Sequence, residues 1–288
     1  MLRVPSFAKI NLYLRVLEKE PGGYHRIETV LQTVSLHDVM YFERLREPRV
    51  EVTADHAPEG EANIAYRAAA LMVPKGRGVR IRIEKKIPIG AGLGGGSSNA
   101  AITLLALNHL FSMNYSLAAL ARLGGQLGTD VPFFLAGGIA CGFHHGEQIV
   151  PLPDLRPRPV TLLYPGVQIL TANAYANLKL TKERPDATIE NFCYSLLNQR
   201  VDQLNTILRN DFDQTVLKDK RIVEARKFLT RQGFGKVHLS GSGSTLFALG
   251  RLRRKLRVRA GWKYWQAHLL TRSQYRKRLG RCLRWPER

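Results

Sequence analysis

Cysteine, acidic residues and long apolar runs are all scarce in this 288-residue sequence. The three cysteines have no paired spacing, which argues against a disulfide framework and against a cysteine-based zinc site, and a reducing compartment suits such a chain. No segment approaches the roughly 18 consecutive apolar residues that a membrane-spanning helix needs. The N-terminal residues lack an apolar block followed by a small-residue cleavage site. We therefore expect a cytoplasmic protein that does not bind membranes.

The shortage of acids is uneven along the chain. Lys and Arg number 44 against 23 Asp and Glu, yet residues 251–288 alone hold 14 of the basic residues and a single acid, Glu287. The rest of the chain is only moderately basic. Aromatic residues such as Trp262 and Trp265 lie among the basic residues of this segment, a combination that can bind RNA through phosphate charge and ring stacking.

Two interpretations of residues 251–288 stay open. The segment completes or extends the domain before it, or it is an unselected extension or an out-of-frame end of the chain. Its abnormal composition favours the second interpretation, under which it is ordered only in part. Nucleic acid is expected as a partner only through this segment, and the sequence does not predict an oligomeric state.

The chain is long enough for two domains of ordinary size. Period-two alternation predicts strands over residues 3–17 and 28–45, and an apolar run predicts a helix from about Ser98 to Phe111. Four prolines in "PLPDLRPRP" (151–159) predict a linker. The sequence therefore predicts an α+β protein with two domains and a basic C-terminal segment, covering residues 1–155, 156–250 and 251–288.

The stretch "IPIGAGLGGGSSNAA" (87–101) holds five glycines within seven residues, between a predicted strand and a predicted helix. It matches the G-x-G-x-x-G pattern of dinucleotide-binding proteins, but no acid lies between Gly96 and Thr129 to hold a ribose. A P-loop needs a lysine directly after its last glycine, and Ser97 and Ser98 stand there instead. What remains is a loop that holds phosphate with backbone N–H groups and a helix N-terminus.

This glycine segment and two other stretches resemble the motifs of the GHMP kinases. The three stretches, in chain order, are "SFAKINLYLRV" (6–16), "PIGAGLGGGSS" (88–98) and "LSGSGSTLFAL" (239–249). Within that family, "GGYHRIETVLQTVSLHD" (22–38) and "GTDVPFFLAGG" (128–138) are similar to the branch that acts on a cytidyl substrate. The likeness covers about residues 1–250.

The resemblance implies both a fold and a reaction. The fold is a GHMP kinase fold, with an N-terminal mixed sheet whose helices carry the glycine segment and a C-terminal ferredoxin-like α/β sandwich. The reaction is ATP-dependent phosphorylation of the 2-hydroxyl of 4-diphosphocytidyl-2-C-methyl-D-erythritol in the non-mevalonate isoprenoid pathway. Two alternatives stay open, namely another GHMP kinase of the homoserine or mevalonate type, and an RNA-binding protein that uses the basic segment.

Transfer of a phosphoryl group to an alcohol needs a base for the hydroxyl and positive charge near the phosphates. The resemblance places the catalytic pair at Asp130, as the base, and Lys9. Taken alone, Asp130 would be interpreted as a turn or helix-capping acid and Lys9 as a solvated surface charge. The family match reverses both interpretations.

The resemblance also implies binding residues and cofactors. ATP is the cofactor, and Mg²⁺ is expected to come with it; spacing reveals no protein metal ligands, although the Ser98 hydroxyl is a candidate. Substrate contacts are expected from Asn11, Tyr24, His25, Thr171 and Tyr175. ATP contacts are expected from Asn63, Ile64, Lys85, Pro88, Ile89, Gly90, Ala91, Gly92, Leu93, Gly94, Gly95, Gly96, Ser97, Ser98, Gly241, Ser242 and Gly243.

Overall fold

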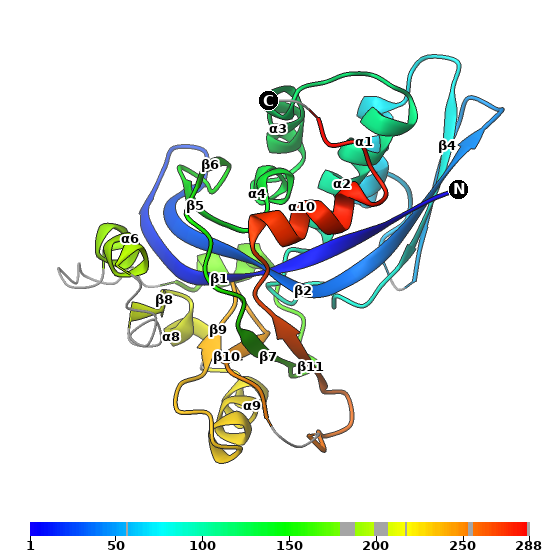
Figure 1. The fold of residues 1–288 in the computed structure, drawn as a ribbon. Coiled ribbons are helices and arrows are strands. Elements are labelled where there is room, and N and C mark those ends of the chain that lie inside the picture. Colours follow the sequence, from blue (N-terminus) through cyan, green and yellow to red (C-terminus); the bar gives the residue numbers. More distant parts are fainter. Residues whose placement is uncertain (56, 179–187, 199–206, 217, 253–255, 287–288) are drawn as a thin grey trace.

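The computed structural model describes residues 1–55, 57–178, 188–198, 207–216, 218–252 and 256–286. They form four layers, in which helices, a first sheet, a second sheet and a further helix follow one another (Figure 1). This mixture of layers confirms the predicted α+β class. Among the described residues, no helix combines the length and the apolar character that a bilayer crossing requires.

The first sheet is built on two long antiparallel strands, β1 (Leu2–Lys19) and β2 (His25–Leu45). Residues 6–14 are buried without interruption, because β1 lies between the helix layer and the second sheet and has no solvent face. The strand order is β3-β4-β2-β1-β8, and β5 and β6 extend it from β2. The remaining strands of this sheet are β3 (Val50–Ala54), β4 (Gly78–Glu84), β5 (Ile139–Phe143), β6 (Gln148–Pro151) and β8 (Arg209–Asn210).

Helices cover one face of this sheet. The innermost, α2 (Gly95–Leu110), is apolar nearly all round and packs against β1 and three other helices. Its start lies three residues before the predicted one, so the helix begins inside the glycine segment. The surrounding elements are η1 (Gly60–Ala62), α1 (Ile64–Met72), α3 (Leu117–Leu127) and α4 (Val131–Ala136).

The second sheet packs on the opposite face of the first, and its strand order is β11-β7-β10-β9. A core of aliphatic and aromatic side chains, to which β1, β2, β7 and β10 contribute, fills the space between the sheets. The strands are β7 (Pro159–Tyr164), β9 (His238–Leu239), β10 (Leu246–Leu249) and β11 (Lys263–His268). The helices that the structure describes in this half are α5 (Thr171–Ala176), α6 (Ile189–Leu197), α8 (Asp213–Val216) and α9 (Lys220–Arg231).

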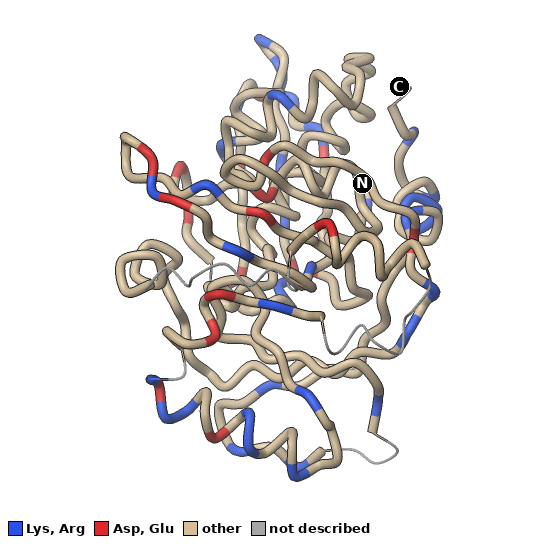
Figure 2. Tube along the Cα trace, turned by 90° about the vertical axis from the view of Figure 1, so that its left-hand side faces the viewer, with Lys and Arg blue, Asp and Glu red and all other residues tan. Residues whose placement is uncertain are grey.

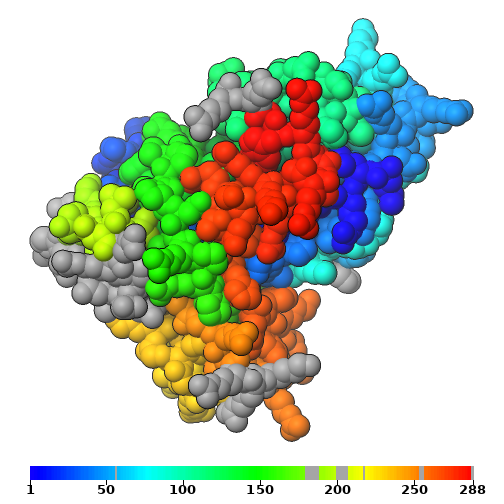
Figure 3. Space-filling model, viewed as in Figure 1, coloured from blue at the N-terminus to red at the C-terminus, as the bar shows by residue number. Residues whose placement is uncertain are grey.

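The basic C-terminal segment takes part in both halves. Its strand β11 pairs with β7, and its helix α10 (Arg272–Gly280) joins the helix layer of the first sheet. In the space-filling view, this segment lies against both the N-terminal strand and the residues around 120–155 (Figure 3). Regular structure therefore extends further into the segment than its composition led us to expect. α10 is rich in Lys and Arg, as the blue tube near the C-terminus in Figure 2 shows, and its Lys277 and Arg278 are exposed.

Tyr275 anchors the C-terminal segment in the hydrophobic core. Its side chain is fully buried, its hydroxyl donates to the Phe134 carbonyl oxygen at 2.5 Å, and its ring lies 5.6 Å from the ring of Phe7. Gly137 approaches the same ring, since a Cβ there would lie 2.2 Å from Tyr275. One aromatic side chain thus joins α10 to β1 and to the end of α4.

We expect Tyr275→Ala to lower the free energy of unfolding by about 3–5 kcal/mol, the cost of truncating a large buried side chain. Urea denaturation followed by circular dichroism measures this value. Lys277→Ala, at an exposed position of the same helix, is the matched control and should change stability little. Equal stability of the two variants would show that α10 does not contribute to the core.

Candidate active site

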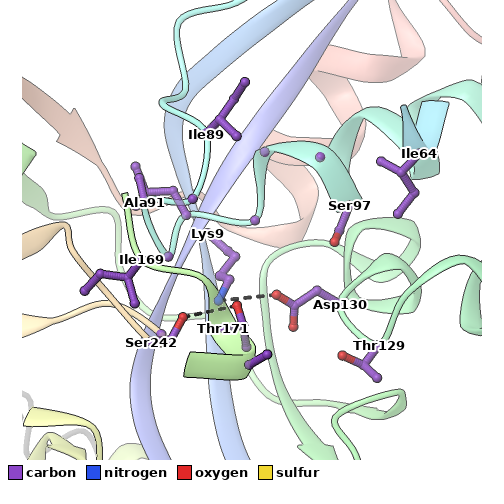
Figure 4. Close-up of a pocket in the computed structure, with 18 of the residues that line it drawn as sticks. Lys9, Ile64, Ile89, Ala91, Ser97, Thr129, Asp130, Ile169, Thr171 and Ser242 are labelled. Carbon is purple, nitrogen blue, oxygen red and sulfur yellow. Dashed lines mark hydrogen bonds and ion pairs between the residues drawn. The ribbon is translucent and has the colours of Figure 1, made fainter. Parts of the chain in front are cut away.

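A cavity of about 1050 Å³ lies between the glycine segment, the start of β2 and α5 (Figure 4). Strand β1 contributes Lys9 and Asn11 to its lining, and the N-terminus of α4 contributes Asp130. Most of the residues singled out from the sequence line this one cavity. They are Lys9, Asn11, Tyr24, His25, Asn63, Ile64, Lys85, residues 88–97, Asp130, Thr171, Tyr175, Gly241 and Ser242.

Two of the predicted residues do not line the cavity. Ser98 is fully buried, and its hydroxyl accepts a hydrogen bond from Ser6 at 2.8 Å. Gly241 and Ser242 line the cavity, but Gly243 does not. The carbonyl oxygen of Gly243 instead lies close to Gly92. In contrast to Ser98, Ser97 lines the cavity, and its hydroxyl faces the cavity (Figure 4).

The glycine segment needs glycine for two physical reasons. Gly90, Gly92 and Gly94 have φ angles of 62°, 75° and 67°, in the region that side chains disfavour. In addition, a Cβ on Gly92 would lie 2.0 Å from the Ser240 carbonyl oxygen. The segment is therefore held against the 240–243 turn by direct backbone approach.

Backbone hydrogen bonds tie the glycine segment to both sheets. The Lys9 amide of β1 donates to the Leu93 carbonyl at 3.0 Å, and the Thr245 amide beside β10 donates to Ala91 at 3.1 Å. The segment leads into α2, whose first amides lack partners within the helix and carry its partial positive charge. A rigid loop that ends in a helix N-terminus can bind phosphate groups.

Lys9 and Asp130 form an ion pair inside the cavity. The Lys9 ammonium lies 3.3 Å from an Asp130 carboxylate oxygen, and its side chain is only 5% exposed (Figure 4). The same ammonium donates to the Asn11 side-chain oxygen at 2.6 Å, and Asn11 in turn donates to the Thr29 hydroxyl at 2.8 Å. Burial of a lysine is costly unless it is paired, so these contacts hold its charge at a defined place.

Asp130 occupies the N-cap position of α4, but its side chain makes no capping hydrogen bond. The carboxylate is 30% exposed and points toward Lys9 across the cavity (Figure 4). An acid that only capped the helix would instead accept a hydrogen bond from a backbone amide. Its carboxylate is therefore available to a bound hydroxyl.

A second buried cation lies at the other end of the glycine segment. The Lys85 ammonium donates to Asp38 at 2.5 Å and to Asn99 at 2.9 Å, and the Asp38 side chain is fully buried. Asp38 also accepts from the backbone amides of Lys86 and Ile87, at 2.7 and 2.8 Å. This carboxylate thus fixes the start of the glycine segment, a role that sequence reasoning missed. The available signal was an acid at position 38 of β2, within the quoted stretch 22–38 that resembles the family.

Aromatic residues line the end of the cavity near the start of β2. The His25 and Tyr175 rings stack on each other, with centroids 4.7 Å apart and planes 19° apart. Burial, together with nearby Lys19, lowers the pKa of His25, so its imidazole stays neutral to more acidic pH than a free histidine. Burial raises the pKa of Tyr175 to about 12, and the Asp130 charge adds to this effect. A flat ring bound between His25 and Tyr175 would require the two rings to separate.

Other predicted residues shape the walls of the cavity. The Asn63 side chain caps α1, accepting from the Ala65 amide at 2.9 Å, and donates to the Pro58 carbonyl at 3.0 Å. The hydroxyls of Thr171 and Ser242 lie 3.3 Å apart and join α5 to the 240–243 turn. Lining residues that sequence reasoning missed include Thr29, Thr129 and His145. Thr29 and Thr129 lie within the stretches 22–38 and 128–138 that resemble the family, which was the available signal, whereas His145 lies outside every quoted stretch.

Comparison with known proteins agrees with this geometry. The family model for the GHMP kinases N terminal domain matches residues 63–138, which include the glycine segment and Asp130. The chain is 37% identical to the 4-diphosphocytidyl-2-C-methyl-D-erythritol kinase of Solibacter usitatus, over 94% of this chain and 89% of that protein. It is 40% identical to the protein of the same name from Exiguobacterium sibiricum, over 85% of this chain and 88% of that protein.

Solved structures show the same relationship. A crystal structure of 4-(cytidine 5'-diphospho)-2C-methyl-D-erythritol kinase superposes with a TM-score of 0.76 at 31% identity, covering 93% of this chain and 99% of that one. A homoserine kinase from Cytophaga hutchinsonii shares the fold, with a TM-score of 0.63 at 18% identity, over 88% of this chain and 86% of that one. The chain therefore belongs to the 4-diphosphocytidyl-2-C-methyl-D-erythritol kinase family of the GHMP kinases, which are ATP-dependent small-molecule kinases.

Proposed function

We propose that the chain transfers the γ-phosphoryl group of ATP to the 2-hydroxyl of 4-diphosphocytidyl-2-C-methyl-D-erythritol. Its curated relatives carry the name of this activity. The observation that carries the proposal is the ion pair of Lys9 and Asp130 in a cavity bordered by the glycine segment. Such a pair supplies both groups that transfer to an alcohol needs, a base and a cation.

In the proposed reaction, the Asp130 carboxylate accepts the proton of the substrate 2-hydroxyl as its oxygen attacks the γ-phosphorus of ATP. The bond between this phosphorus and the β,γ-bridging oxygen breaks, and ADP leaves. Lys9 holds Asp130 in position and offsets negative charge that develops on the transferred group. Asn11 and Thr29 keep the lysine in place through their hydrogen bonds. The amides of the glycine segment and of the α2 N-terminus bind the phosphates of ATP.

We also propose that Mg²⁺ accompanies ATP. The cavity offers oxygen donors, which this hard cation prefers, from the Ser97 hydroxyl and the Asp130 carboxylate. These two residues would hold the ion, and it would neutralise phosphate charge during transfer. Ser98 is not a candidate, because its hydroxyl is buried against Ser6.

The cytidine end of the substrate is assigned to the aromatic residues near the start of β2. Tyr24 is 63% exposed, its ring lies 5.0 Å from that of His145, and both residues line the cavity. A neutral His25 imidazole offers one donor and one acceptor to the polar edge of a pyrimidine. The adenine of ATP is assigned to the opposite wall, near Asn63, Ile64 and Lys85.

A kinase assay with parallel substrates tests the proposal. We expect ATP to be consumed with the cytidyl substrate and not with mevalonate or homoserine. Asp130→Asn should lower kcat by about 10²- to 10⁴-fold, the usual contribution of a general base. Asp219→Asn is the matched control, because Asp219 is the N-cap of α9 and does cap its helix. Turnover of mevalonate or homoserine instead, or full activity of Asp130→Asn, would refute the proposal.

The phosphate-binding role of the glycine segment predicts a further result. Gly92→Ala should weaken ATP binding about tenfold or more, because the methyl group meets the Ser240 carbonyl and strains a positive φ. Gly125→Ala, within α3 where a Cβ meets no atom within 4 Å, should leave ATP affinity unchanged. Calorimetric titration of both variants with ATP makes the comparison. Equal affinities would show that the segment does not bind phosphate.

The assignment of the cytidine end predicts a selective defect. Tyr24→Ala should raise KM for the cytidyl substrate several-fold or more, because stacking on a base contributes about 1–3 kcal/mol, and KM for ATP should not change. Tyr194→Ala is the control, since Tyr194 on α6 is also 63% exposed but lies outside the cavity. Steady-state kinetics with each substrate varied in turn separates the two effects. A change in KM for ATP alone would contradict the assignment and would indicate that the adenine of ATP, and not the cytidine of the substrate, binds near Tyr24.

A further inference from the structure

Three metal-ligating side chains meet at the rim of the cavity. Glu20 directly follows β1, and His144 and His145 lie in the turn between β5 and β6. The two turns approach each other because β5 pairs with β2, and the Ile27 amide donates to the His144 carbonyl at 2.7 Å. The ligand atoms of Glu20, His144 and His145 all lie within 4.8 Å of one another.

The ring nitrogens converge on one carboxylate oxygen. The Nε2 atom of His145 lies 2.9 Å from Oε2 of Glu20, and the Nε2 atom of His144 lies 3.9 Å from the same oxygen. Bonds of about 2.0–2.2 Å to one ion place its donors about 3–4 Å apart. The other oxygen of Glu20, Oε1, lies 3.8 Å from Nε of Arg26, so this ion pair uses a different oxygen from the one on which the imidazoles converge.

Glu147 contacts both histidines on the side away from Glu20. One of its oxygens lies 2.6 Å from Nδ1 of His144, and the other accepts from the His145 backbone amide at 3.0 Å. A histidine that binds a metal ion usually donates its second ring N–H to a carboxylate, which fixes the tautomer and the ring orientation. His144 also has a φ of 63°, an uncommon conformation for a residue other than glycine.

We propose that Glu20, His144 and His145 form a site for a borderline divalent transition metal ion such as Zn²⁺, Co²⁺ or Ni²⁺. Two imidazole nitrogens and one carboxylate oxygen suit these ions, whereas Mg²⁺ prefers oxygen ligands alone. The site is therefore separate from any Mg²⁺ that accompanies ATP. The ion would join the turn after β1 to the β5–β6 hairpin.

This site borders the proposed cytidine end of the cavity. His145 lines the cavity, and the Tyr24 ring packs on it at 5.0 Å. An ion that fixes His145 would also restrict Tyr24, so occupancy would change how the substrate is held. That consequence rests on the proposed function, but metal binding itself does not.

Titration of the untagged, full-length chain with Zn²⁺ and Co²⁺, in the absence of nucleotide, tests the site. We expect one ion per chain by calorimetry, visible absorption bands of bound Co²⁺, and a higher unfolding temperature with Zn²⁺. His145→Ala and Glu20→Gln should each weaken binding at least tenfold. Glu147→Gln should weaken it about 10- to 100-fold by removing the supporting carboxylate.

His268→Ala is the matched control, because His268 is an exposed histidine on β11 that does not belong to the Glu20, His144 and His145 cluster. This variant should bind Zn²⁺ as tightly as the wild type does. Far-UV circular dichroism checks that each variant is folded. Absence of Zn²⁺ binding, or equal binding by the wild type, His145→Ala and Glu20→Gln, would overturn the proposal. Because no kinase substrate is present, these outcomes are independent of the catalytic assay.

Discussion

Close backbone contact between the glycine segment and its neighbours positions the two sheets and the cavity relative to each other. Gly92 lies so near Ser240 that no side chain fits between them, and hydrogen bonds from Lys9 and Thr245 hold the segment on both sides. The two sheets therefore meet along this loop. The same contacts leave the N-terminus of α2 facing the cavity, so the contact between the two sheets and the proposed phosphate-binding surface share one set of backbone atoms.

Buried charge is the second organising feature. Lys9 and Lys85 are both nearly inaccessible, yet their pairing differs. Lys85 is bonded to a fully buried carboxylate and an amide, an arrangement that fixes the start of the glycine segment. Lys9 is paired with a partly exposed carboxylate at the longer distance of 3.3 Å, so its partner can still reach a bound molecule. The Lys9–Asp130 pair, whose carboxylate is the more exposed, is therefore the one that suits the proposed proton transfer.

The C-terminal segment shows where composition misleads. An excess of Lys and Arg reads as a solvated or disordered extension when charge is counted along the chain. In the structure, Tyr275 and Leu279 are fully buried beneath a basic outer surface, and β11 forms an edge of the second sheet. A few apolar residues at helical spacing are enough to anchor such a helix, because burial depends on one face and not on the average.

The α+β class, the long strands β1 and β2, and the position of the glycine segment between a strand and a helix could all be predicted from the amino-acid sequence. These features follow from local periodicity and from backbone angles that only glycine adopts readily. The meeting of Lys9 and Asp130 was expected only from the family resemblance, and the contacts of Asp38 with Lys85 and of Glu20 with His144 and His145 appear only in the folded chain. Each of these contacts joins distant parts of the chain, and its geometry depends on how sheets and helices pack. No local pattern in the sequence encodes that packing.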